Sequence, residues 1–188
     1  MIPIKLTIEG LYSYQKRHTI DFENLINAGL FGIFGSVGSG KSSILEAITF
    51  ALYGETERLN KQDKRAYNMM NLKSDTAFIA FDFYNYEDKI FRVTREFKRN
   101  SKRFDDIKSP TVVFYEWIND HWIPLDHSNA QEIIGLSYDN FKRTIIIPQG
   151  KFKEFIELGA KDRTQMMKEI FKLHRFDLAD KVSVLNSK

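Results

Sequence analysis

Residues 30–54 read LFGIFGSVGSGKSSILEAITFALYG, and this segment carries the strongest indication of the fold. Residues 30–34 are apolar around a single glycine, which predicts a short buried strand. Residues 35–42 then match the pattern G-x-x-x-x-G-K-[ST] at every fixed position. A helix is predicted over residues 41–53, with a glycine at its end. Because this helix is apolar on nearly every face, we expect it to be buried.

The pattern at residues 35–42 is typical of a phosphate-binding loop, or P-loop. Its glycines let the backbone curl so that N–H groups point at phosphate oxygens, and the following helix adds its positive dipole end. We expect Lys41 to contact the β- and γ-phosphates of ATP and the Ser42 hydroxyl to ligate Mg²⁺. The alternative, a chance match in a Gly/Ser-rich turn, is disfavoured by the strand–loop–helix context. The residues expected to bind the nucleotide are Gly35, Ser36, Val37, Gly38, Ser39, Gly40, Lys41, Ser42 and Ser43.

The composition is that of one globular domain. The chain has 188 residues, of which 43% are hydrophobic and 28% charged, enough for a substantial core. Its net charge of +3 permits nucleic-acid binding without implying it. The absence of cysteine excludes disulfides and cysteine-based zinc sites. Because no apolar stretch has the character of a signal peptide or a membrane span, a cytoplasmic protein is expected.

Alternating apolar and polar residues predict further strands, separated by turn residues. These strands cover residues 4–9, 18–22, 77–84, 89–98, 111–118 and 121–124, which indicates an α/β fold with an antiparallel meander. A short helix is predicted at residues 128–135 and a β-branched strand at residues 144–147. From about Asp162 onward one long helix is expected, and since no capping glycine ends it, we interpret the chain as a fragment.

Gln149 lies at the exit of the strand predicted at residues 144–147. In ABC-type ATPases a glutamine in this setting completes the magnesium shell and senses the γ-phosphate. A glutamine in a turn is otherwise a solvated residue, but its position between a strand and a helix, downstream of a P-loop, favours the functional interpretation. The expected Mg²⁺ contacts of this chain are therefore Ser42 and Gln149.

The chain resembles the N-terminal half of the ATPase head of the SbcC family, in residues 4–11, 32–54 and 141–152. Members of this family are the ATPase subunits of the SbcC–SbcD double-strand-break repair nuclease, and they are similar to Rad-fifty and other SMC-like ABC ATPases. Residues 159–175 resemble the start of the family's coiled-coil arm. The resemblance implies an N-terminal lobe over residues 1–160, with P-loop, β meander and Q-loop. Residues 161–188 would be a helix that roots the coiled coil.

The resemblance also implies an ATP hydrolase whose head is split in sequence. A C-terminal lobe would supply the signature loop, the Walker B Asp–Glu pair and a switch histidine, and two heads would sandwich two ATP molecules. The implied partners are that C-terminal lobe, a second head, an SbcD-type metallophosphoesterase nuclease and double-stranded DNA at the nucleoid, with no membrane. The ATP-bound dimer would gate the nuclease.

One departure from the family concerns the first hairpin turn, where members commonly carry a basic residue. This chain has Leu11-Tyr12-Ser13-Tyr14 there, so a phosphate contact from the turn would need Lys16 or Arg17 as a substitute.

No catalytic residue is expected in this chain. The best match to a Walker B strand is residues 77–82, ending in Asp82, but Phe83 follows where the catalytic glutamate belongs. Residues 136–140 begin like a signature loop, yet they lack its glycines and predict a helix cap instead. We therefore expect the chain to bind ATP but not to hydrolyse it alone.

Basic residues cluster around the loop between the second and third strands of the meander. The candidates for sequence-independent contacts to DNA phosphates are Arg95, Lys98, Arg99, Lys102 and Arg103, and the alternative is a solvated hairpin tip. The phenylalanines interleaved there, Phe91, Phe97 and Phe104, fit core positions of strands better than base stacking.

Two other functions stay open at this point. The first is a DNA-tethering head of the SMC, RecF or RecN type that has no nuclease partner. The second and less favoured is a self-contained P-loop kinase or NTPase, which would need its own Walker B strand and lid arginines.

Overall fold

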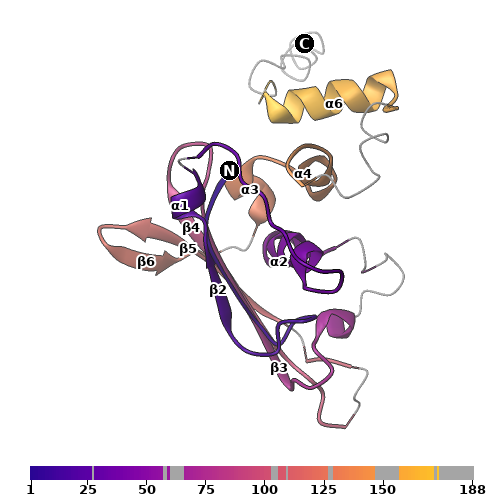
Figure 1. Ribbon diagram of the computed structural model, residues 1–188. Coiled ribbons are helices and arrows are strands. Elements are labelled where there is room, and N and C mark those ends of the chain that lie inside the picture. Colours follow the sequence, from indigo (N-terminus) through magenta and orange to yellow (C-terminus); the bar gives the residue numbers. More distant parts are fainter. Residues whose placement is uncertain are drawn as a thin grey trace, which may run out of the picture. The chain divides into compact units, whose positions relative to one another are not determined.

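The computed structural model describes residues 1–26, 28–56, 59, 66–102, 106–108, 110–126, 129–146, 157–171 and 173. The chain divides into two compact units, residues 1–129 and residues 130–188. The first unit contains a β-sheet and helix α2, and the described elements of the second are helices (Figure 1). Within the described residues, no helix has both the length and the apolar character needed to cross a membrane.

A six-stranded antiparallel sheet forms the body of the first unit, with the strand order β2-β1-β3-β4-β5-β6. The strands are β1 (Ile2–Glu9), β2 (His18–Asp21), β3 (Thr76–Tyr84), β4 (Ile90–Lys98), β5 (Thr111–Ile118) and β6 (His121–Pro124). The predicted meander is confirmed. Side chains alternate between the two faces of a strand. Leu6 of β1 and Ile79 and Phe81 of the neighbouring β3 are completely buried.

Helix α2 (Lys41–Tyr53) packs on β3 and β4, against one face of the sheet (Figure 1). Its Phe50 meets Phe97 of β4 edge to face, with ring centroids 5.8 Å apart, and both rings are buried. Gly54 ends the helix with φ of 70°, and its N–H donates to the Phe50 carbonyl at 2.8 Å. The predictions of a buried helix, of its glycine stop and of core positions for Phe91 and Phe97 are confirmed.

A side chain of the sheet also holds the C-terminal end of α2. Arg95 of β4 donates from Nε to the Ala51 carbonyl at 2.7 Å and from Nη2 to the Leu52 carbonyl at 3.3 Å. These carbonyls belong to the last turn, where the helix dipole is negative and a cation is stabilising. Burial lowers the pKa of Arg95 to about 10.

The strand predicted at residues 30–34 is wrong. Residues 30–36 form neither helix nor strand, and Leu30 and Phe34 are 87% and 92% exposed. A strand needs a neighbour to take its backbone hydrogen bonds, and none of the described strands pairs with this segment. The segment follows a short helix, α1 (Glu23–Ile26), and Phe31 contacts Phe22 with ring centroids 6.1 Å apart. A single 3₁₀ turn, η1 (Ala66–Met69), precedes β3.

The second unit begins with α3 (Ala130–Ile134) and α4 (Tyr138–Thr144). The first confirms the short helix predicted at residues 128–135. The strand predicted at residues 144–147 is wrong in its described part, because Thr144 ends α4 and the Ile145 N–H donates to Phe141. Ser137 caps this helix by accepting from the Asn140 N–H at 3.4 Å, as the cap predicted at residues 136–140 requires. Capping and tertiary packing outweigh the strand preference of the β-branched residues here.

Helix α6 (Ala160–Ile170) overlaps the long helix predicted from Asp162 onward, but it ends at Ile170, because Phe171 lies in a turn. Residues 174–188 lie outside the described residues, so the start of a coiled-coil arm stays a prediction.

Candidate nucleotide-binding site

The P-loop connects residue 34 to the first turn of α2. Gly38 and Gly40 have φ of 85° and 89°, in the left-handed region that glycine enters without a steric penalty. Gly40 is also the N-cap of α2, so the loop ends at the N-terminus of the helix, where the helix dipole is positive. The loop itself is exposed, with Val37 fully open to solvent. This is the geometry expected of a loop that receives an anion.

Lys41, the first residue of α2, turns its side chain back onto the loop. Its Nζ donates to the carbonyl oxygens of Gly35 and Ser36, both at 2.8 Å, and lies 3.4 Å from Ser39 Oγ. Carbonyl oxygens carry only partial negative charge, so a phosphate is a stronger partner for this ammonium than the three oxygens that surround it. The donor set therefore fits the phosphates of a nucleotide.

Two residues were predicted to contact Mg²⁺. Ser42 is exposed in the first turn of α2, where a hydroxyl suits a hard cation that also binds phosphate oxygens. Gln149 lies outside the described residues, so its contact stays a prediction. Ser43 is buried at 6% exposure, and its nucleotide contact likewise stays a prediction.

A hairpin turn between β1 and β2, residues Leu11–Tyr14, touches the P-loop from outside. Ser13 Oγ donates to the Gly38 carbonyl and the Tyr14 hydroxyl donates to the Gly40 carbonyl, both at 3.3 Å. These contacts were not predicted from the sequence, because the family resemblance pointed only to a basic residue in this turn. Arg17, one of the two suggested substitutes, pairs with Glu9 at 2.7 Å and lies over the Phe78 ring.

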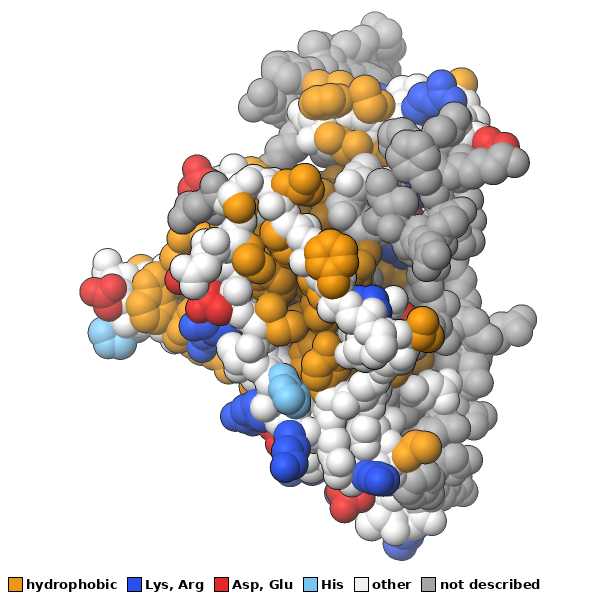
Figure 2. All heavy atoms as spheres, viewed as in Figure 1, with side chains coloured by type: hydrophobic (Ala, Val, Ile, Leu, Met, Phe, Trp, Pro, Cys, Tyr) orange, Lys and Arg blue, Asp and Glu red, His pale blue; other side chains and the backbone are white. Residues whose placement is uncertain are grey.

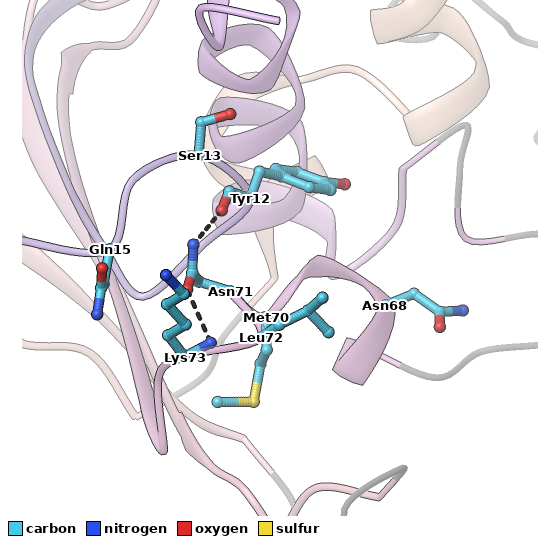
Figure 3. A pocket seen from close by; sticks show the side chains of 8 residues that line it. All are labelled: Tyr12, Ser13, Gln15, Asn68, Met70, Asn71, Leu72 and Lys73. Atoms are coloured by element: carbon cyan, nitrogen blue, oxygen red, sulfur yellow. Dashed lines mark hydrogen bonds between the residues drawn. The ribbon is translucent and has the colours of Figure 1, made fainter.

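A pocket of about 580 Å³ lies beside this turn (Figure 3). It is lined by Tyr12, Ser13, Gln15, Asn68, Met70, Asn71, Leu72 and Lys73. The Asn71 side chain links two segments that line the pocket. Its Nδ2 donates to the Tyr12 carbonyl at 2.6 Å, and its Oδ1 accepts from the Lys73 N–H at 2.9 Å (Figure 3). Ser13 thus belongs both to the pocket and to the support of the P-loop.

Comparison with known proteins places this loop in a family. The sequence profile described as an AAA domain matches residues 5–183. The chain belongs to the AAA domain family. It is 38% identical over 183 residues to the SbcC subunit of the SbcCD nuclease of Bacillus subtilis, covering 94% of this chain and 16% of that protein. The protein of the same name from Clostridium acetobutylicum is 39% identical over 184 residues, covering 94% and 15%.

A third relative of this AAA domain chain is the probable DNA double-strand break repair Rad50 ATPase of Aquifex aeolicus. It is 31% identical over 198 residues, covering 100% of this chain and 18% of the relative. The resemblance to the SbcC family is confirmed. The chain spans less than a fifth of the length of each of these three relatives.

In this AAA domain chain, Asp82 is a structural residue and not a magnesium ligand of Walker B type. It lies within the antiparallel sheet on β3, 6% exposed, and accepts from Arg92 Nε and Nη2 at 2.6 Å each. The hydrogen bond to Asp82 raises the pKa of Arg92, whose guanidinium also lies 4.2 Å from the Trp122 ring centroid. The carboxylate is fully engaged by this two-pronged ion pair.

Replacing Asp82 with alanine is expected to lower the free energy of unfolding by about 2 to 3 kcal/mol, because it leaves the half-buried Arg92 cation unpaired. Affinity for ATP should not change, since Asp82 belongs to the sheet. Chemical denaturation and calorimetric titration of the variant measure the two quantities. Glu87→Ala is the control, because it breaks the exposed Lys89–Glu87 pair, which is worth about 1 kcal/mol at most. An Asp82→Ala protein as stable as this control contradicts the structural role.

The basic cluster divides into side chains that serve the fold and side chains that face solvent. Arg95 caps α2, and Arg99 is 9% exposed and donates to the carbonyls of Asn71 and Ser74 at 3.1 to 3.2 Å. Lys98 and Lys102 are exposed. Lys98 Nζ forms a long ion pair of 3.7 Å with a carboxylate oxygen of Glu96, which is also exposed. Arg103 lies outside the described residues, as does Phe104. Of the five residues proposed for DNA contact, two are therefore described as available at the surface.

Proposed function

We propose that this chain is the ATP-binding N-terminal part of an SMC-like ABC ATPase head that acts in DNA double-strand-break repair. The observation that carries the proposal is Lys41 Nζ held inside a glycine-rich loop at the start of a helix, in a chain 38% identical to the SbcC subunit of an SbcCD nuclease. The backbone of residues 35–42 would hold the phosphates, and Lys41 would neutralise them. Ser42 and Gln149 would hold Mg²⁺, which supplies further charge neutralisation at the phosphates.

The missing part of the head is the second element of the proposal. Apolar side chains are exposed over the face that carries α1 and α2 (Figure 2). Among the exposed apolar residues are Leu30, Phe31, Ile33 and Phe34 of the segment before the P-loop. An exposed apolar run of this kind is suited to pack against a further part of the protein, here a C-terminal lobe. The chain covers 15 to 18% of these relatives, and a protein of their length would have room for such a lobe.

In this proposal the chain binds ATP but needs the C-terminal lobe to hydrolyse it. That lobe would bring the signature loop and the acidic residues of Walker B, while Asp82 is occupied by Arg92. Two heads would close on two ATP molecules, and the closed state would change the access of an SbcD-type nuclease to DNA. The γ-phosphate is then the switch between the two states.

The experiment is co-expression of this chain with the C-terminal lobe of the same protein. We expect Mg²⁺-dependent ATP hydrolysis and an ATP-dependent dimer, measured by phosphate release and light scattering, only when both lobes are present. Robust hydrolysis by the 188-residue chain alone contradicts the proposal and favours a self-contained NTPase. Co-purification of a metallophosphoesterase supports nuclease gating, whereas a kleisin-like partner supports a DNA-tethering head.

Contact with DNA is proposed for Lys98 and Lys102, with Arg103 as a further candidate. In the assembled head, the double variant Lys98→Gln/Lys102→Gln is expected to bind duplex DNA more weakly and with a flatter salt dependence. Removing one lysine–phosphate pair lowers the slope of log K against log salt by about 0.9, so removing both should lower it by about 1.8. Fluorescence anisotropy over a range of salt concentrations measures this slope.

Lys89→Gln is the matched control for this pair. Lys89 is exposed but lies next to the opposite end of β4 from Lys98. An unchanged slope in the double variant would remove the loop from the DNA-binding surface.

A further inference from the structure

Two side chains of the turn at residues 11–14, Ser13 and Tyr14, donate hydrogen bonds to backbone carbonyls of the P-loop. In a trans peptide the C=O and the following N–H point in opposite directions. A hydroxyl that holds the Gly40 carbonyl therefore directs the Lys41 N–H away from the turn. Likewise, the Gly38–Ser39 peptide is held at both ends, by Ser13 at the carbonyl and by the Ser36 carbonyl, 3.3 Å from the Ser39 N–H. The turn thus sets the orientation of two peptide planes of the loop.

The contact between Tyr14 and Gly40 is also a close steric fit. A Cβ on Gly40 would lie 2.9 Å from Tyr14 Cε2 and 3.1 Å from its Cζ and Oη, so only glycine allows this approach. The ring of Tyr14 meets His18 edge to face, with centroids 5.6 Å apart. Burial raises the pKa of Tyr14, whose hydroxyl donates to the Gly40 carbonyl. The ring and its hydroxyl together cover the outer side of the helix N-terminus.

The turn can act as a support because it is itself held rigidly. Leu11 is fully buried and exchanges two backbone hydrogen bonds with Tyr14, at 2.7 and 3.1 Å. Tyr12 has φ of 46°, and its N–H and C=O are both engaged: the N–H donates to Met69 at 2.8 Å and the C=O accepts from Asn71 Nδ2 at 2.6 Å. Figure 3 shows the Asn71 side chain reaching Tyr12 from the neighbouring segment. A left-handed Tyr12 is strained, and these bonds stabilise it.

We propose that Ser13 and Tyr14 are positioning residues that hold the P-loop in its nucleotide-binding conformation before ATP arrives. They act through the carbonyls of Gly38 and Gly40 and need no contact with the nucleotide. This inference rests on the proposed ATP site. It explains how a turn without a basic residue contributes to that site: it lowers the ordering cost of binding and supplies no charge to the phosphates.

The test compares ATP affinities of the full chain by calorimetric titration with Mg²⁺ present. Tyr14→Phe keeps the aromatic ring and removes the hydroxyl donor. Ser13→Ala removes the hydroxyl donor of the exposed serine. Each is expected to weaken ATP binding about three- to tenfold, the usual effect of one hydrogen bond. The double variant should weaken binding more than either single variant, and Ser13→Thr, which restores a hydroxyl, should recover the affinity. Tyr86→Phe, at the exposed turn between β3 and β4, is the matched control.

Hydrogen exchange separates positioning from general stabilisation. In Tyr14→Phe, the amides of residues 36–41 should exchange faster while the melting temperature and the exchange of the sheet stay unchanged. Wild-type affinity in the double variant, together with abolished binding in Lys41→Ala, overturns this inference and leaves the ATP site intact. Absence of ATP binding by the wild-type chain overturns the inference and the proposed function together.

Discussion

Replacing Lys41 with alanine is expected to reduce the affinity of the chain for ATP more than a hundredfold. Nζ is the cation that lies inside the loop, within 2.8 Å of the Gly35 and Ser36 carbonyls. With ATP bound, Lys41 would form a hydrogen-bonded charge pair with the phosphates. Truncating one partner of such a pair, once the ligand covers it, costs about 3 kcal/mol or more, and every 1.4 kcal/mol is a factor of about ten in affinity. Calorimetric titration of the chain with ATP and Mg²⁺ measures the decrease.

The control for this variant is Lys89→Ala, which removes an exposed lysine whose pair with Glu87 is also exposed. Both variants should melt at the wild-type temperature, because neither side chain is part of the core. Affinity in Lys41→Ala within threefold of wild type would falsify the assignment of residues 35–42 as the phosphate site. A decrease in Lys89→Ala as large as in Lys41→Ala would mean that surface charge, and not the loop, attracts the nucleotide.

Replacing Gly10 with alanine is expected to have the largest effect on stability. Gly10 has φ of 66°, and a Cβ there would lie 2.0 Å from the Thr76 carbonyl oxygen and 3.1 Å from Ala77 Cα. These are backbone atoms of β3 in the middle of the sheet, which cannot move aside like the end of a flexible side chain. Gly10 also accepts from the Asn71 N–H at 2.9 Å, so a shift there disturbs the segment that braces the turn.

The unfolding free energy of Gly10→Ala should fall by more than about 4 kcal/mol, a large part of the stability of a domain this size. Gly29→Ala is the matched control, because Gly29 has a similar φ of 68° but nothing within 4 Å of an added Cβ. It isolates the cost of a left-handed alanine, about 1 to 2 kcal/mol. Urea denaturation followed by circular dichroism measures both. Equal decreases in the two variants would show that the clash with Thr76 is relieved at no cost.

The contrast between Asp82 and Lys41 shows how similar sequence signals acquire different roles. Each residue stands in a segment that matches a nucleotide-binding motif. Asp82 follows an apolar run like that of a Walker B strand, and Lys41 lies in the P-loop pattern of residues 35–42. The P-loop match carries its own geometry, because glycines at fixed spacing determine which backbone conformations the loop can adopt. An apolar strand ending in aspartate carries no such geometry. Its meaning depends on the neighbouring strand, and here that strand supplies Arg92.

Short-range signals in the sequence are sufficient to predict the local elements and the phosphate loop. Period-two alternation is enough to locate β1, β3, β4 and β5, and the glycine at position 54 is enough to end α2. These signals act over a few residues, so they can be read without knowing which segments meet. For the same reason the cap at residues 136–140 was predicted, while the described part of the β-branched run after it is not the predicted strand.

The roles of the charged and polar groups depend on tertiary packing, which separates those that serve the fold from those that are available to a ligand. Arg95 and Arg99 lie in the same basic run as Lys98 and Lys102, but the first two meet carbonyls of α2 and of residues 71–74. The support of the P-loop by Ser13 and Tyr14 joins residues 25 and 26 positions apart. Such pairings depend on how strands and loops fold back on one another, and no short-range pattern encodes them.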